Sequence, residues 1–362
     1  MRRIAASLAT NGRGFMPDLR PLASDLSSMS TTTDRRYVCQ LGHNEQIKQV
    51  FLASEKQLRP NRNGNLYLQL QLSDRSGTIA ARLWNASEND YRAFENGDYV
   101  LVEGNTQLFQ GNMQFIANAV RRARQDEVDE TDFLVLRTDE IDHMATRLAE
   151  ILRTIQTPEL RNLAECFLMD SDFMAKFAMA PAGMKNHHAY KGGLLEHVVG
   201  LMELVLAVAP RYPRLDQDKL LVGALLHDAA KVDELSYDRD ISYTDDGQLL
   251  GHMVLAITMI DDKVREAERL SGEPFPKQLV TEIKHMVISH HGEYEYGSPK
   301  LPMTLEAVAL HHLDNLDAKM ASFTQLMVDC PNVESNWTQY HTNLGRKLYK
   351  GARIEEREAS GG

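Results

Sequence analysis

The apolar residues of this chain change their spacing once, and this change constrains the fold more than any other feature. In residues 46–120 apolar and polar side chains alternate, as in the run Leu66-Tyr-Leu-Gln-Leu-Gln-Leu72. From Ile141 onward apolar residues recur every three or four positions. A period of two turns one face of a β-strand toward a core, whereas a period of 3.6 does the same for a helix. We therefore expect a β domain followed by an all-α domain.

The β half contains five short predicted strands. They include the residues Val50, Leu66, Ile79, Tyr99 and Met113. Turn-forming residues separate the later strands at 74–77, 96–98 and 110–112, and a polar helical insert is predicted at 86–95. Five short strands in so compact a segment fit a small closed barrel of the OB type.

Two phrases of the β half resemble OB-fold nucleic-acid-binding domains. They are Leu-Ser-Asp-Arg-Ser-Gly-Thr-Ile-Ala-Ala-Arg-Leu-Trp at 72–84 and Gly-Asp-Tyr-Val-Leu-Val-Glu-Gly at 97–104. On such a barrel, exposed aromatic rings stack on bases and cations follow the phosphates, although a strand aromatic can also serve the core. The candidates for contact with single-stranded nucleic acid are Lys56, Arg59, Arg62, Tyr67, Arg82, Trp84 and Phe109.

The predicted domain plan has five parts. Residues 1–45 are expected to be a disordered extension, within which Met29 is an alternative start. Residues 46–125 form the OB domain, and the acidic residues 126–140 form a linker. The helical domain spans 141–330. In the tail, 331–362, residues 336–357 are expected to form a helix that either packs on a neighbouring subunit or guides substrate.

The two halves carry opposite net charge. Residues 1–125 hold 16 Lys and Arg against 11 Asp and Glu, a net charge of +5. Residues 126–362 hold 24 against 40, a net charge of −16, which gives −11 for the whole chain. A mildly basic domain can meet phosphates, and an acidic domain can hold cations.

Apolar runs and cysteines indicate the compartment. The longest apolar run, residues 194–209, is interrupted by Glu196, His197 and Glu203, so it does not offer the about 20 apolar residues that a membrane span needs. Three cysteines far apart give neither a disulfide framework nor a CxxC metal site. We expect a reducing, cytoplasmic setting and no association with a membrane.

Twelve of the thirteen histidines follow Glu140, and they are grouped. The groups lie at the ends or inner faces of apolar helical segments: His187-His188, His197, His227-Asp228, His252, His290-His291 and His311-His312. Neutral imidazoles and carboxylates on rigid helices are good ligands for first-row divalent cations. One buried histidine can be an ordinary core group, but so many polar positions on apolar helices indicate a metal centre.

The order of these residues resembles a known metal-binding pattern. The series His197, His227-Asp228, His252, His290-His291 and Asp314 is similar to that of the HD superfamily in its two-metal form. The phrases at 188–197, 243–252 and 289–299, together with the OB domain, make residues 46–350 resemble the YhaM family of 3′-to-5′ exoribonucleases.

The resemblance implies a role for each site residue. One ion would be held by His197, His227, Asp228 and Asp314, and a second by His252, His290 and His291, with Asp228 bridging both. Asp317, one helical turn after Asp314, is the alternative terminal ligand. Lys231 would act with Asp228 in catalysis as a fixed positive charge facing the substrate phosphate. His187 and His188 could contact that phosphate, whereas His285 is expected to pack on its helix.

The resemblance also implies a function and a cofactor. The expected activity is metal-dependent hydrolysis of single-stranded RNA, with DNA as an alternative, to nucleoside monophosphates. Two divalent ions are expected, with Mn²⁺ preferred and Co²⁺, Fe²⁺ and Mg²⁺ as alternatives. Two other functions stay open: a phosphohydrolase acting on nucleotides or cyclic dinucleotides, and a single-strand-binding protein without catalysis. The chain could also form a homo-oligomer.

Overall fold

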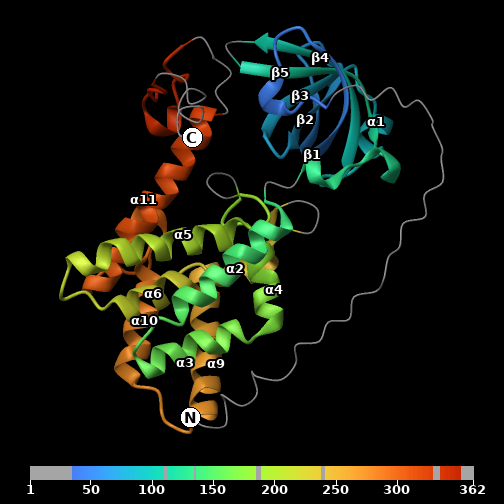
Figure 1. The fold of residues 1–362 in the computed structure, drawn as a ribbon. Helices are drawn as coiled ribbons and strands as arrows, with labels where there is room; N and C mark the ends of the chain where they lie inside the picture. Colours follow the sequence, from blue (N-terminus) through green and yellow to red (C-terminus); the bar gives the residue numbers. More distant parts are fainter. Residues whose placement is uncertain are drawn as a thin grey trace, which may run out of the picture. The chain divides into compact units, whose positions relative to one another are not determined.

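The computed structural model describes residues 35–109, 112–133, 136–184, 189–237, 241–328 and 335–351. Met29 and nearly all of the predicted N-terminal extension lie outside these residues. Figure 1 shows a β-barrel built from residues 46–122 and a helical bundle built from residues 138–328. The predicted fold class, an OB-type barrel followed by an all-α domain, is therefore confirmed.

Five strands close the barrel in the order β1-β2-β3-β5-β4, and β4 pairs again with β1. The pairing of β3 with β5 is parallel, and the other four pairings are antiparallel. Closure leaves no unpaired sheet edge. The elements are β1 (Gln46–Pro60), β2 (Leu66–Asp74), β3 (Gly77–Trp84), α1 (Glu88–Arg92), β4 (Tyr99–Phe109) and β5 (Asn112–Arg122).

The apolar side chains of the alternating segments point into the barrel, as the period of two predicts. Leu68, Leu70 and Leu72 of β2 point inward and are at most 1% exposed. The rings of Phe51 and Phe115 meet edge to face across the core, with their centroids 6.2 Å apart. Each of these side chains contributes about 1.5–3 kcal/mol by leaving water.

Residues before β1 also belong to the barrel. The short 3-10 helix Val38–Gln40 is tied to β2 by the Val38 amide, which donates to the Asp74 carboxylate at 2.8 Å. Leu41 is buried in the barrel core, and the Asn44 amide donates to the Thr106 carbonyl. The predicted extension is thus too long at its C-terminal end, because residues 36–45 pack against the strands.

The predicted linker packs on the barrel as well. The Arg75 amide donates to the Asp132 carbonyl at 2.8 Å, and the Tyr37 hydroxyl donates to the Asp132 carboxylate at 2.9 Å. The rings of Tyr99 and Phe133 lie 4.7 Å apart. The part of this segment up to residue 133 is therefore attached to the barrel.

The helical domain consists mainly of helices, with one small sheet in which β6 (Leu235–Ser236) pairs antiparallel with β7 (Ser242–Tyr243). The helices are α2 (Thr138–Leu152), α3 (Pro158–Leu168), α4 (Ser171–Met179), α5 (Gly193–Val208), α6 (Gln217–Leu226), α7 (Lys231–Glu234), α8 (Asp245–Leu250), α9 (His252–Ser271), α10 (Lys277–Ser289) and α11 (Leu305–Val328). The helical period that begins at Ile141 predicts seven segments, 141–155, 160–169, 194–209, 219–226, 253–270, 279–290 and 302–328, which correspond to α2, α3, α5, α6, α9, α10 and α11. The sequence missed α4, α7 and α8, because so few turns do not display a period.

Helix α5 packs against α2, α4, α6 and α11. Leu194, Leu195, Val198, Leu201 and Met202 are all fully buried. Among the described residues, the stretch Gly193–Arg211 is the segment whose length and apolar composition would suffice to cross a membrane. Its apolar residues here fill the core of the helical domain, because neighbours contact the helix on several sides.

Within the tail the structure describes residues 335–351, which form a hairpin rather than part of the expected helix. Two antiparallel bridges join Trp337 to Tyr349 and His341 to Arg346. The 3-10 turn Thr342–Leu344 connects the two arms, and Gly345 adopts the left-handed φ of 62° that closes the turn. We call residues 335–351 the C-terminal hairpin.

The close approach of β4 to β5 yields a stability prediction. Gly104 lies at an irregular step in this pairing, and an added Cβ would come within 2.1 Å of the Ile116 carbonyl oxygen. We expect Gly104→Ala to destabilise the barrel by about 1–3 kcal/mol, because the backbone must shift to admit the methyl group. Thermal unfolding measures this effect. Gly183→Ala is the control, since no atom lies within 4 Å of its added Cβ, and equal melting temperatures for both variants would contradict the prediction.

Candidate metal centre

Histidine and aspartate side chains from several helices meet in one buried region of the helical domain. His197 lies in α5, His227 and Asp228 follow α6, His252 begins α9, His290 and His291 follow α10, and Asp314 lies in α11. Most of these residues stand at helix ends, where the chain changes direction. Gly292, with a φ of +78°, turns the chain away directly after His291.

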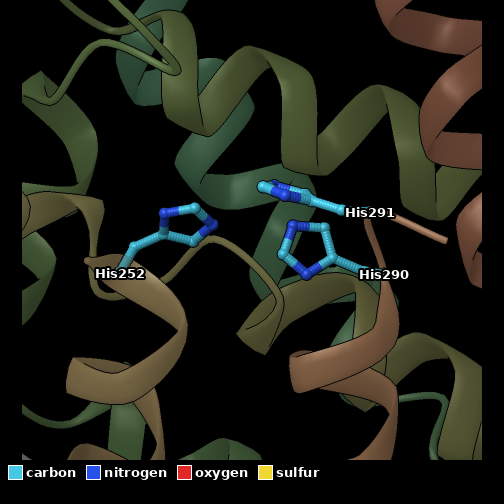
Figure 2. A group of neighbouring side chains, drawn as sticks. All are labelled: His252, His290 and His291. Carbon is cyan, nitrogen blue, oxygen red and sulfur yellow. The ribbon is translucent and has the colours of Figure 1, made fainter. Parts of the chain in front are cut away.

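The side chains form two groups of potential ligands. His197, His227 and Asp228 make one group, and His252, His290 and His291 make the other. Within each group the ligand atoms lie within 4.8 Å of one another. Figure 2 shows the three rings of the second group turned toward one another, from the start of α9 and from the turn after α10.

The Asp228 carboxylate lies between the two groups. Its Oδ2 is 3.4 Å from His227 Nε2, whereas its Oδ1 is 3.4 Å from His252 Nε2 and 3.6 Å from His290 Nε2. One oxygen thus faces each group. This arrangement would allow the carboxylate to bridge two cations.

Three of the rings are oriented by backbone carbonyls. The Nδ1 of His227 lies 2.9 Å from the Ala224 oxygen, and that of His290 lies 2.6 Å from the Val287 oxygen. The Nδ1 of His291 lies 2.8 Å from the Tyr296 oxygen. A carbonyl only accepts, so each Nδ1 carries the proton and each Nε2 has its lone pair available to a cation.

Carboxylates orient the other two rings. Glu234 Oε1 lies 3.0 Å from His252 Nδ1 and accepts from the His252 amide at 2.9 Å. Asp317 Oδ2 lies 2.7 Å from His197 Nδ1, while Asp314 Oδ1 lies 3.3 Å from His197 Nε2. Asp314 is therefore on the inner side of the ring and Asp317 on the outer side, which favours Asp314 as the ligand.

Sequence reasoning missed Glu234. The sequence carries no signal that separates it from its neighbour Asp233, which forms an ion pair with Lys176 at 2.7 Å. The rotation of the short helix α7 turns Glu234 inward and Asp233 outward.

Two buried polar atoms in the centre have no hydrogen-bond partner among the described residues. They are Asp228 Oδ1 and His252 Nε2. Buried polar atoms are normally paired, because an unpaired one costs about 1–3 kcal/mol. Both atoms are ligand atoms of the types that a divalent cation binds. The residues present therefore fit a metal.

The electrostatic environment also favours the protonation states in which these side chains bind a metal at neutral pH, neutral imidazole and ionised carboxylate. Burial holds the pKa of His290 well below its usual value and also lowers that of His291. Burial alone would raise the pKa of Asp228, but the adjacent Lys231 ammonium outweighs burial and holds the pKa well below the usual value. The rings of His290 and His291 are thus neutral, and Asp228 is ionised.

His197 behaves differently. Burial opposes its charged form, yet hydrogen bonds to Asp314 and Asp317 raise the pKa of His197 to about 9. A proton on this ring would therefore compete with a cation for Nε2.

Lys231 lies directly against the bridging carboxylate. Its Nζ donates to Asp228 Oδ2 at 2.6 Å and to the Ala182 carbonyl. Burial would lower the pKa of Lys231, but the Asp228 carboxylate outweighs burial and raises it. The ammonium group stays charged inside the site.

The remaining histidines have other partners. His285 Nε2 accepts from the Met303 amide at 2.9 Å, as expected of a residue that packs on its helix. His311 Nδ1 lies 2.8 Å from the backbone carbonyl of His290, not from its ring. His187 and His188 lie outside the described residues.

Most of the predicted nucleic-acid contacts lie on one outer face of the barrel. Arg59, Tyr67 and Trp84 are direct neighbours across β1, β2 and β3. The rings of Tyr67 and Trp84 lie 5.0 Å apart, and Trp84 is 44% exposed. Arg82 shares this face, where it donates to Gln114 at 2.6 Å. Elsewhere, Arg62 is exposed in the loop after β1, and Phe109 is exposed at the end of β4.

Lys56 does not lie on that face, contrary to the prediction from sequence. Its side chain is 2% exposed, and its Nζ donates to the carbonyls of Tyr91 and Phe94. The pairing of β1 is irregular between Ser54 and Gln57, and this irregularity interrupts the alternation of faces along the strand. The prediction that Lys56 contacts nucleic acid is therefore wrong.

Both domains of the chain match known protein families. A family model described as HD domain matches residues 194–319, and one described as OB-fold nucleic acid binding domain matches residues 52–123. The 3'-5' exoribonuclease YhaM of Geobacillus sp. (strain WCH70) is 39% identical over 259 residues, which are 71% of this chain and 78% of that protein. The 3'-5' exoribonuclease YhaM of Bacillus subtilis (strain 168) is 35% identical over 277 residues, 76% of this chain and 86% of its own.

These relatives span both the barrel and the helical domain, and their identity extends over most of each chain. The HD model covers the helices that carry His197, His227, Asp228, His252, His290, His291 and Asp314. The chain therefore belongs to the YhaM family of 3'-5' exoribonucleases.

Proposed function

We propose that this protein is a metal-dependent exoribonuclease that removes nucleoside monophosphates from the 3′ end of single-stranded RNA. The observation that carries this proposal is the buried Asp228 carboxylate between two histidine groups whose Nε2 atoms face the same centre. A barrel of the single-strand-binding type in the same chain supports a polymeric substrate.

We infer two cation positions. His197, His227 and Asp314 would hold one ion, and His252, His290 and His291 the other, with Asp228 shared. Mn²⁺ suits this mixed set of nitrogen and oxygen ligands best, with Co²⁺, Fe²⁺ and Mg²⁺ as alternatives. The ions would supply Lewis acidity and an activated water for attack on phosphorus.

The residues around the ligands have distinct tasks in this proposal. Glu234 and Asp317 orient the rings of His252 and His197 through Nδ1. Lys231 holds a positive charge beside Asp228, where it can stabilise the negative charge that develops on the phosphate. The pre-set orientation of these groups means that they need not reorganise when substrate binds.

The barrel would hold the strand that is being shortened. Trp84 and Tyr67 offer adjacent rings for base stacking, and Arg59, Arg62 and Arg82 offer charge for phosphates. Phe109 is a further candidate at the end of β4.

We infer a cytoplasmic, reducing setting from the thiols. Cys39 is exposed and Cys166 is buried, and both are free thiols. Burial raises the pKa of Cys166 to about 11, so this thiol is unreactive at neutral pH. Cys330 lies outside the described residues.

Digestion of 5′-labelled single-stranded RNA tests the proposed activity. We expect a ladder that shortens from the 3′ end with Mn²⁺ and no cleavage after thorough chelation, because the site residues offer ligands but no nucleophile of their own. A cyclic dinucleotide is incubated with the protein under the same conditions, because it is the substrate of the alternative function. Undiminished cleavage of RNA with chelator, or hydrolysis of the cyclic dinucleotide alone, would contradict the proposal.

The bridging role of Asp228 can be tested against the role of Lys231. Asp228→Asn keeps the shape of the side chain but removes its charge, so we expect metal content and turnover to fall together, turnover by at least about 100-fold. Lys231→Met removes no ligand atom, so metal content should stay near wild type while turnover falls by about 100- to 1,000-fold.

Metal analysis of the purified variants and single-turnover kinetics provide the two measurements. A lower melting temperature for Asp228→Asn with wild-type metal content and rate would show that Asp228 is only a buried structural group. Loss of metal from Lys231→Met would contradict the separation of the two roles.

Asp314 and Asp317 provide a matched pair, since they are one helical turn apart on α11. We expect Asp314→Asn to lose activity that added Mn²⁺ does not restore, because a ligand is missing. Asp317→Asn should weaken metal affinity by about 10- to 100-fold and recover at high Mn²⁺, because it loses only the orientation of His197. Titration of activity with Mn²⁺ distinguishes them, and the reverse order of recovery would make Asp317 the ligand.

A further inference from the structure

The C-terminal hairpin has a composition unlike the rest of the helical half. Its 17 residues, 335–351, contain Arg346, Lys347 and Lys350 but no Asp or Glu. The surrounding half of the chain, residues 126–362, holds 40 acidic residues against 24 basic ones. Residues 335–351 thus carry a net positive charge, between Glu334 before them and Glu355, Glu356 and Glu358 after them in sequence.

The hairpin places aromatic rings and a cation on its outer face. Thr338 and Leu348 are paired across the two arms by two 2.9 Å hydrogen bonds, and both are buried. Residues next to these in extended arms point to the opposite side. Trp337, Lys347 and Tyr349 therefore share the outer face, where all three are exposed.

The two rings are arranged as a pair. Trp337 and Tyr349 face each other across the bridge with their centroids 5.0 Å apart and an angle of 56° between the ring planes. They are 49% and 56% exposed, although each could bury far more surface against a partner. Because both rings are about half exposed to solvent, their free faces are available for stacking.

The hairpin also carries two exposed cations, Arg346 and Lys347. The Arg346 guanidinium lies 5.9 Å from the Phe323 ring, which connects the hairpin to α11. Lys347 lies two residues before Tyr349 in sequence and is exposed. In the part of the chain that the structure describes, neither Arg346 nor Lys347 pairs with a carboxylate.

We propose that the C-terminal hairpin is a second binding surface for single-stranded RNA, with Trp337 and Tyr349 stacking on bases and Lys347 contacting a phosphate. This proposal rests on the proposed function, since it assigns a further contact to the same substrate. Exposed rings interspersed with cations are the usual means of holding a single strand without regard to sequence. Protein interfaces also favour Trp, Tyr and Arg but are depleted in Lys, so the exposed Lys347 is the feature that favours a phosphate-bearing partner.

A second contact has a consequence for substrate length. A strand that touches both the barrel and the hairpin rebinds one surface while it is held by the other, so its overall affinity exceeds that of either surface. A strand too short to reach both gains nothing. The hairpin should therefore favour long RNA over fragments of a few nucleotides.

The two tryptophans of the chain allow a direct test, because Trp84 lies in the barrel and Trp337 in the hairpin. In Trp84→Phe, the indole of Trp337 is the sole tryptophan reporter. We expect an oligouridylate of about 20 nucleotides, added with chelator present, to quench this fluorescence to saturation as bases stack on the ring. The reciprocal variant Trp337→Phe reports on the barrel in the same titration.

Charge is tested in the Trp84→Phe background. Lys347→Gln should weaken binding and reduce the slope of log affinity against log salt concentration by about 0.7, the value for one phosphate contact on a single strand. Lys277→Gln, an exposed lysine of α10, is the matched control and should leave both quantities unchanged. In addition, Trp337→Ala with Tyr349→Ala should lower kcat/KM on the long RNA by about tenfold or more. Its kcat/KM on a dinucleotide should stay near wild type.

The outcomes separate the two proposals. If RNA quenches Trp84 but not Trp337, the hairpin proposal is overturned while the proposed function stands. If the Trp337 signal depends on protein concentration rather than RNA, and light scattering follows it, the hairpin is a subunit contact and the proposal is also overturned. If the wild-type protein neither binds nor degrades RNA, the proposed function fails and the hairpin proposal fails with it.

Discussion

The helical domain depends on one buried charge, the carboxylate of Asp228. This side chain is almost entirely enclosed, and isolation of a carboxylate from water costs several kcal/mol unless positive charge lies nearby. Lys231 supplies that charge at Oδ2, whereas Oδ1 faces His252 and His290 without a hydrogen bond. The region on that side is complete only when a further cation is present. The buried carboxylate therefore links the fold of the domain to its chemistry.

The rings around Asp228 are positioned by two different means. His227 and His290 each cap a helix and bond the carbonyl three residues earlier, so their orientation is set within their own helix. His197 and His252 instead need the carboxylates of Asp317 and Glu234, which come from other elements. The orientation of His227 and His290 is therefore kept whenever their own helices are formed. The orientation of His197 and His252 requires the correct packing of α5, α7, α9 and α11, which the apolar core provides.

The sequence predicts most of this fold because each half repeats a single hydrophobic period, and it predicts the histidine groups because they stand at the ends of apolar helices. It fails where the local conformation breaks a period. An irregular step in β1 turns Lys56 inward, and the short helix α7 gives no periodic signal for Glu234. Only the resemblance to the HD pattern favours Asp314 over Asp317 at the level of sequence, since both project from the same face of α11. The orientation of one ring, His197, distinguishes them.

The distribution of charge suggests how such a domain acts on a polyanion. The acidic surface of residues 126–362 repels phosphates at long range, and Lys231 with any bound cations acts only within the site. Attraction must then come from segments that lack this acidity, which are the barrel before the helical domain in sequence and the C-terminal hairpin after it. If the hairpin proposal holds, a strand long enough to reach those segments as well as the centre would gain from each additional contact. Preference for long RNA would thus follow from where the chain places its acidic and basic residues, without any sequence-specific contact.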